Sequence, residues 1–149
     1  MEVKILNAEE VRQRLEQMRR DLERATDTDI VVGSNLAYAP GIEYGRHPGG
    51  RVARKAGGAF ALTDAFKAVR PNIAPAMAQA LERGIDVSTV LWKAGYDVEA
   101  FTKAYLGERV YAQPIPTTRK GKPKWQRMGT LKNSFQAKTA RDFRALYRS

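Results

Sequence analysis

A helix and a strand, predicted in direct succession within the first third of the chain, constrain the fold more than any other feature. Asn7 has the position of an N-cap, with Glu10 three residues on as its capping-box partner. Apolar residues then recur at helical spacing, at Val11, Leu15, Met18 and Leu22. We therefore expect a helix over residues 8–24, packed on a sheet through this stripe and solvated on its other face. A coiled-coil strand is the alternative, although only about two heptads are present.

Two short segments carry the expected sheet. Ile30, Val31 and Val32 are consecutive apolar residues, which predicts a strand buried on both faces. A second strand is expected around residues 131–137. The resulting fold class is α+β: a small antiparallel sheet packed by the long N-terminal helix and further short helices, with a long exposed loop and arm. A chain of 149 residues fits a single domain over residues 1–149.

Several short helices are predicted in the middle of the chain, within residues 63–106. Thr63 is expected to cap one that begins at the next residue, and Pro71 is expected to end it. Asn72 is expected to cap the next helix. Two more are predicted over residues 88–92 and 97–106, the latter starting at a capping aspartate.

Two segments are rich in glycine, proline and basic residues and lack apolar periodicity. Residues 45–59 contain five glycines and four basic residues, which predicts a mobile loop. Residues 113–127 contain three prolines and five basic residues, which predicts an extended basic arm. Contacts to DNA or to an acidic partner are predicted for the basic side chains of both segments: Arg51, Arg54, Lys55, Arg119, Lys120, Lys122, Lys124 and Arg127.

Composition narrows the classes of function. The net charge is +10, and residues 107–149 hold 11 basic against 2 acidic side chains. Such a basic segment suggests a polyanion or an acidic protein surface as partner, or a solvated tail, and charge alone does not choose among them. The chain has no cysteine, which excludes disulfides and thiolate sites. It has no apolar run of the ~18–20 residues that a membrane span needs, and its first residues are unlike a signal peptide. We expect a soluble protein made in a cytoplasm, with no membrane partner.

Candidate catalytic groups are sparse. His47 lies in a Gly/Pro-rich segment without a carboxylate or cysteine at metal-ligand spacing. Ser34, Ser88 and Ser134 are formal nucleophiles, but none lies in a nucleophile elbow. Glu43 has the chemistry of a general base, although a carboxylate of this kind more often pairs with an arginine or a backbone amide. The sequence predicts no enzyme, no cofactor and no metal site.

Three segments together resemble the tail-completion, or head–tail joining, proteins of the neck of tailed bacteriophages. "VGSNLAYAPGIEYG" resembles that family's strand followed by a Tyr-Ala-Pro turn and an aromatic–Glu–aromatic sequence. "RPNIAPAMAQAL" resembles the helix that follows, and "GTLKNSFQAK" resembles a strand entry. In the family's usual order the last element comes first. The resemblance therefore implies either a permuted relative of this family or a related neck protein with an inserted helical segment at residues 85–106.

The resemblance implies a structural virion protein that forms a ring, expected to be hexameric, with a tail-completion or tail-terminator role. Its partners would be copies of itself, a portal-side connector, tail tube or terminator proteins, and passing genomic DNA. It would lie in the virion neck, and in the host cytoplasm during assembly. The subunit interface is predicted at Tyr38, Pro40, Glu43, Tyr44 and Trp125. Tyrosines that cover the chain's own core are the alternative.

A small basic nucleic-acid-binding protein is the second hypothesis. The segment "TTRKGKPKWQR" interleaves basic residues with Trp125, a combination that suits a phosphate-tracking groove with a stacking ring. The charge favours this hypothesis, whereas the three resembling segments favour the neck protein.

Overall fold

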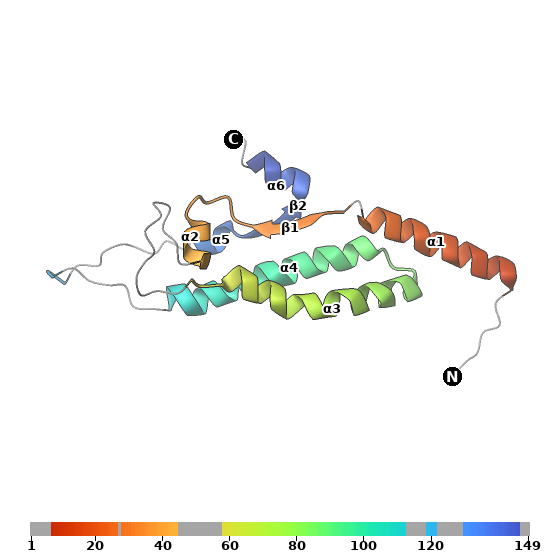
Figure 1. The fold of residues 1–149 in the computed structure, drawn as a ribbon, viewed down its shortest axis with the longest axis horizontal. Helices are drawn as coiled ribbons and strands as arrows, with labels where there is room; N and C mark the ends of the chain where they lie inside the picture. The colour runs from red at the N-terminus through yellow and green to blue at the C-terminus, as the bar shows by residue number, and fades with distance from the viewer. Residues whose placement is uncertain (1–6, 27, 45–57, 113–118, 122–129, 147–149) are drawn as a thin grey trace.

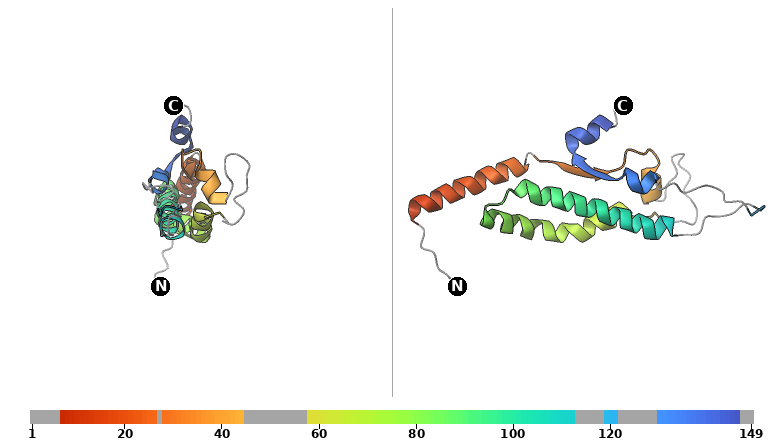
Figure 2. Two further views of the ribbon diagram at one scale, coloured as in Figure 1. Left: turned by 90° about the vertical axis from the view of Figure 1, so that its left-hand side faces the viewer. Right: turned by 180° about the vertical axis from the view of Figure 1, so that it is seen from behind.

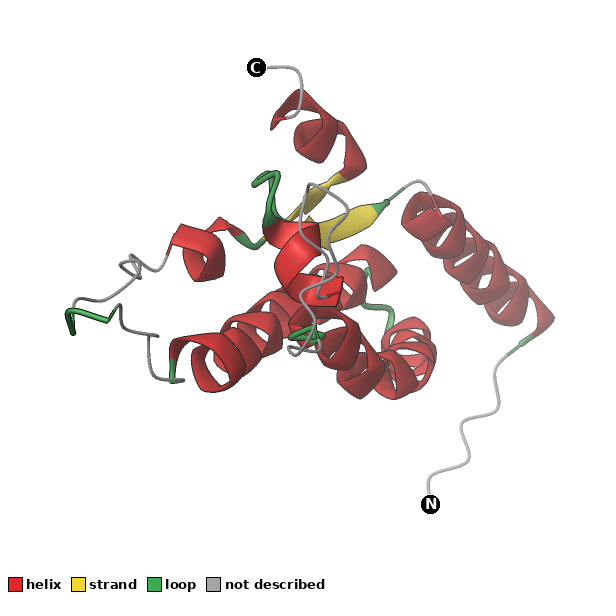
Figure 3. Ribbon diagram, turned by 60° about the vertical axis from the view of Figure 1, so that its left-hand side comes forward, coloured by secondary structure: helices red, strands yellow, loops and turns green. Residues whose placement is uncertain are grey.

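The computed structural model describes residues 7–26, 28–44, 58–112, 119–121 and 130–146. Its elements run in the order α1 (Ala8–Thr26), β1 (Ile30–Gly33), α2 (Ala39–Tyr44), α3 (Ala61–Arg83), α4 (Val87–Leu106), the π-helical turn η1 (Gly107–Tyr111), α5 (Thr130–Ser134), β2 (Gln136–Thr139) and α6 (Ala140–Leu146). Helices dominate, and the two strands form one small sheet among them (Figures 1 and 3). The predicted α+β class with a small antiparallel sheet is confirmed.

The sheet joins two strands that lie about a hundred residues apart in the chain. β1 and β2 pair antiparallel, with Ile30 opposite Thr139 and Gly33 opposite Gln136. Helix α4 lies beneath both strands, and α6 lies on the far side of the sheet (Figures 1 and 2). The predicted strand over Ile30–Val32 is confirmed, but its residues are half-buried rather than buried on both faces as expected.

Helices α3 and α4 form a long antiparallel hairpin that is the largest packed unit of the fold (Figure 1). Val69 of α3 and Val98 of α4 share one buried cluster, and Gly84 ends α3 in a left-handed conformation (φ 67°). The prediction of several short helices in this region was wrong, because the chain forms two long ones. The length of the hairpin gives each helix a continuous apolar face, and such packing contributes more to helix stability than local propensity does.

Four local predictions within the hairpin were wrong. Thr63 is not a cap, because α3 already begins at Ala61. Pro71 and Pro75 lie inside α3 rather than ending it, so Asn72 caps no new helix. Both prolines are exposed and one turn apart, so the N–H groups they lack fall on the solvent side, and the opposite side remains packed on α4. Asp97 begins no helix, since it lies within α4, whose N-cap is Asp86. The Asp97 carboxylate instead pairs with the Lys93 ammonium at 2.7 Å.

Helix α1 agrees with its predicted bounds and cap, but its position is unexpected. The Asn7 side chain accepts from the Glu10 N–H at 2.8 Å, and the Glu10 carboxylate accepts from the Asn7 N–H at 3.2 Å. The helix then projects past the hairpin tip, away from the sheet (Figure 1). The stripe residues Val11, Leu15 and Leu22 are 40%, 59% and 41% exposed. The expectation that this stripe packs on the sheet was wrong, since α4 occupies that place.

The C-terminal segment differs from its predicted strand. Residues 130–134 form the short helix α5, and the strand begins only at Gln136. Leu131 and Phe135 are buried against Leu106 and Ala39. Leu131 lies within α5 and Phe135 directly follows it, so a helical turn replaces the first part of the predicted strand.

The predicted loop and arm fall mostly on residues 45–57, 113–118 and 122–129, which lie outside the described residues. At the end of the loop, the Ala59 N–H donates to the Ile42 carbonyl at 2.9 Å. Within the described ranges, no helix combines the length and apolar character that crossing a membrane requires.

Candidate interface site

The segment with the Tyr-Ala-Pro sequence forms helix α2 rather than a turn. Pro40 is its second residue, a position where the missing N–H is not needed by the helix. Ala39 points into the core, whereas Tyr38 and Tyr44 are 42% and 58% exposed at the two ends.

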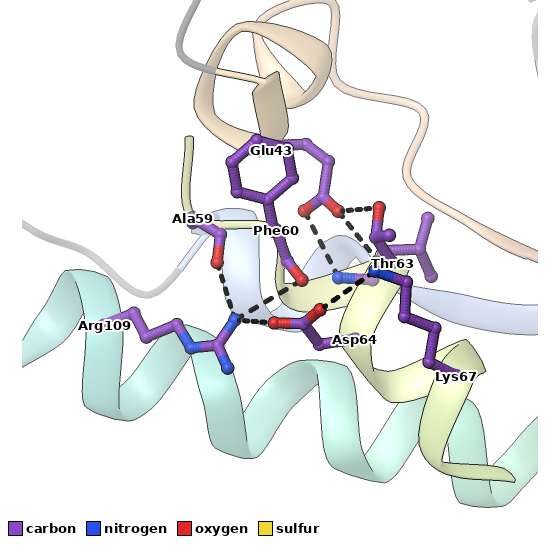
Figure 4. Close-up of polar contacts among 8 residues, drawn as sticks. Glu43, Ala59, Phe60, Thr63, Asp64, Lys67 and Arg109 are labelled. Atoms are coloured by element: carbon purple, nitrogen blue, oxygen red, sulfur yellow. Dashed lines mark hydrogen bonds and ion pairs between the residues drawn. The ribbon is translucent and has the colours of Figure 1, made fainter. Parts of the chain in front are cut away.

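Glu43 connects α2 to the beginning of α3 (Figure 4). Its carboxylate accepts from the Leu62 N–H at 3.2 Å, from the Thr63 N–H at 2.9 Å and from the Thr63 hydroxyl at 2.8 Å. The first N–H groups of a helix have no intrahelical acceptor, and the helix N-terminus favours negative charge. Glu43 therefore supplies the cap that α3 lacks locally, because Phe60 at the N-cap position makes no side-chain cap.

This contact revises the predicted role of Glu43. The side chain is only 5% exposed, and each of its hydrogen bonds goes to its own chain. The expectation of an exposed interface charge was wrong, since the carboxylate points into the protein. The reading of Glu43 as a backbone-amide partner is the one that the structure supports.

Arg109 holds the same helix start from the opposite side (Figure 4). Its guanidinium lies 2.6 Å from a carboxylate oxygen of Asp64 and donates to the Ala59 carbonyl at 2.8 Å. It also stacks over the Tyr105 ring, 4.6 Å from the centroid. Phe60, between these contacts, adopts a left-handed conformation (φ 46°), which is uncommon for a residue other than glycine. The surrounding hydrogen bonds thus fix a strained backbone in one conformation.

The backbone of the same region approaches α2 closely. The Phe60 N–H donates to the Glu43 carbonyl at 3.1 Å. A Cβ on Gly58 would lie 2.1 Å from that carbonyl oxygen, so only glycine fits here. Both ends of the expected loop are therefore held together at its base.

Two of the three resembling segments also meet. The hydroxyls of Ser34 and Ser134 lie 2.6 Å apart, and Ser34 also accepts from the Leu36 N–H at 3.2 Å. Ser134 in turn donates to the Leu131 carbonyl at 2.7 Å. The segment at 31–44 thus contacts α5 through these serines and the start of α3 through Glu43.

Three exposed aromatic residues lie in or beside this fixed region. The Tyr44 and Phe60 rings meet edge to face with centroids 6.3 Å apart, and Phe60 is 42% exposed. A cavity of about 200 Å³ lies beside Tyr44 and Pro40 and is also lined by Phe135 and Phe143. We call Tyr38, Tyr44 and Phe60 the aromatic surface.

The structure places only some of the predicted contact residues. Tyr38, Pro40, Glu43 and Tyr44 come together at α2, and Arg119 and Lys120 are exposed. The remainder lie outside the described residues: Arg51, Arg54, Lys55, Lys122, Lys124, Trp125 and Arg127. Sequence reasoning missed Phe60, Asp64 and Arg109, because no local pattern indicates that these three residues converge.

Neither a metal-ligand cluster in the described part of the chain nor a known relative identifies this site. Among the described residues, no three potential metal ligands gather, and His47 is outside them. No protein-family model matches the chain, and searches of curated proteins and of solved structures found no significant match.

Proposed function

We propose that this chain is a structural protein of the phage neck, which forms a ring between the head connector and the tail. The resemblance of three sequence segments motivates the proposal. The observation that carries it is the aromatic surface, where exposed tyrosines border a backbone fixed by part-buried hydrogen bonds to Glu43.

Rigid aromatic side chains suit a subunit interface for a physical reason. Tyrosine offers a large contact area with few rotatable bonds, so little side-chain entropy is lost on association. The contacts of Glu43 and Arg109 fix the backbone beneath before a partner arrives. An interface built this way loses little conformational freedom on binding.

In this role the chain contacts further copies of itself, a connector on the portal side, and tail tube or terminator proteins. It belongs in the virion neck after assembly in the host cytoplasm. The basic C-terminal third would face passing DNA or acidic neighbours.

A particle-assembly assay with a double variant, Tyr38→Ala with Tyr44→Ala, tests the proposal. We expect incorporation into particles to fall at least tenfold while the free energy of unfolding changes little, because both side chains are largely exposed. Tyr96→Ala is the matched control, since Tyr96 is 56% exposed but lies on α4. Normal incorporation of the double variant would reject the aromatic surface as an interface.

Nucleic-acid binding is the second candidate, favoured by the 11 basic residues in residues 107–149. It predicts tight duplex-DNA binding whose log K falls with log salt by about 0.9 for each phosphate contacted. The neck role predicts only weak non-specific binding, at about 10⁻⁴–10⁻⁶ M. It also predicts that Trp125→Ala impairs assembly while DNA affinity changes by less than about threefold. Titration of both proteins at two salt concentrations separates the candidates.

A further inference from the structure

The two edges of the small sheet differ. The outer edge of β2 is occupied, since the Ala137 N–H donates to the Glu99 carboxylate at 2.8 Å. On the other strand, the Asp29 carbonyl accepts from the Ala140 N–H. Antiparallel pairing alternates, so the backbone groups of Ile30 and Val32 point away from β2. The sheet has two strands in the described part of the chain, so β1 has no neighbour there on this edge. An unpaired edge is a template for another strand.

An apolar groove accompanies this open edge. It encloses about 560 Å³ and is lined by β1 together with side chains of the helical hairpin: Leu62, Phe66, Ile73, Leu91 and Val98. No β2 residue contributes to it. Phe66 is 49% exposed, which is high for a phenylalanine beside a core. A third strand paired with β1 would cover these side chains.

Residues 1–6, which precede α1, have the sequence that such a strand needs. In "MEVKIL", the apolar Met1, Val3 and Ile5 alternate with charged residues, so one face of an extended segment is apolar. Val3 and Ile5 are β-branched, and the segment has no glycine or proline. The other segments of six or more residues outside the described ranges are poorer candidates, because each contains proline, which donates no backbone hydrogen bond.

Chain length prevents residues 1–6 from reaching their own β1. Helix α1 has 19 residues, and β1 lies beyond its C-terminal end (Figure 1). The helix therefore separates the segment from the strand by about 28 Å. Six extended residues span at most about 20 Å. The same segment on another copy has no such restriction.

We propose that residues 1–6 of a second copy add to the open edge of β1 as a third strand, with Val3 and Ile5 in the groove. The donating segment and the receiving edge are different surfaces, so the contact is heterologous and can close into a ring. The inference concerns the self-association part of the proposed function. It is tested on purified protein, so its failure is distinguishable from a failure of neck incorporation.

Sedimentation of the full chain over a range of concentrations tests the proposal with two variants. Val3→Asp with Ile5→Asp removes the donor, and Phe66→Asp places a charge in the acceptor groove. We expect each to weaken self-association at least 100-fold, because apolar side chains no longer leave water. Glu2→Ala with Lys4→Ala is the matched control on the opposite face of the segment, and it should associate like the wild type. Circular dichroism confirms that each variant is folded.

A mixture of the two weakened variants gives the sharpest result. The donor variant keeps an intact groove and the groove variant keeps an intact donor, so together they should form a one-to-one complex. A mixture that stays monomeric overturns the proposal, as does a donor variant that associates like the wild type. A monomeric wild type, whatever occupies its groove, overturns it too. If Phe66→Asp does not fold, mixing the donor variant with wild type remains decisive, because the donor variant should then end growing assemblies and lower their mass.

Discussion

Substitution of Glu43 tests whether a carboxylate twenty residues distant determines where α3 begins. Glu43→Ala removes three hydrogen bonds, two of them from the first N–H groups of the helix. It leaves those N–H groups without their acceptor in a part-buried region. Glu43→Lys is more severe, because it places a positive charge against the positive end of the helix.

The expected magnitude follows from the kinds of contact that are lost. Hydrogen bonds to charged groups contribute about 1.5–3 kcal/mol, and loss of an N-cap costs about 0.5–2 kcal/mol. These terms overlap, so we expect Glu43→Ala to lower the free energy of unfolding by about 2–4 kcal/mol. That is a large share of the roughly 5–15 kcal/mol typical of a domain.

Urea unfolding followed by circular dichroism measures the change. Glu16→Ala is the matched control: the Glu16 side chain is 66% exposed and pairs with Arg20 on the surface of α1. Such pairs contribute about 0–1 kcal/mol, so the control should remain near wild type. The reasoning fails if Glu43→Ala unfolds within about 0.5 kcal/mol of the wild type, because α3 would then need no distant cap.

Three further substitutions test other parts of the fold. Gly95→Ala should destabilise the protein by about 1–3 kcal/mol in the same unfolding assay, since its Cβ would lie 2.7 Å from Ile30 Cγ2; a neutral result would show that β1 yields easily. Burial raises the pKa of Glu99, but hydrogen bonds from Lys103 and a β2 backbone N–H outweigh it and hold the pKa below the ordinary 4.5. The stabilising contribution of Glu99 is therefore present above pH 4.5 and lost as pH falls through the lowered pKa. Glu99→Gln should accordingly lose less unfolding free energy than the wild type between about pH 5 and pH 3, and equal losses in the two proteins would contradict this. Arg109→Met should cost about 1–2 kcal/mol, moderated by partial exposure, and hydrogen exchange at the start of α3 should quicken; unchanged exchange there would show that the guanidinium does not hold the helix start.

Local sequence determined the elements whose signals are complete within a few residues. The reciprocal hydrogen bonds of Asn7 and Glu10 need only a three-residue spacing, so the start of α1 was predictable. The apolar Ile30–Val32 run likewise indicated a strand wherever its partner lay. Neither signal says what the element packs against, and the exposed stripe on α1 shows this limit.

Tertiary packing decided the elements whose local signals are weak or misleading. Pro71 is a helix breaker in isolation, yet α3 passes through it because packing along α4 offsets the missing hydrogen bond. Glu43 was predictable as a partner for some amide. Which amide it finds depends on a fold that brings α2 onto the start of α3. The sequence alone determined the charges and the helical and strand patterns. Contacts across 20 to 100 residues determined the α3 cap, the aromatic surface and the open sheet edge, because only the folded backbone brings such distant groups within bonding distance.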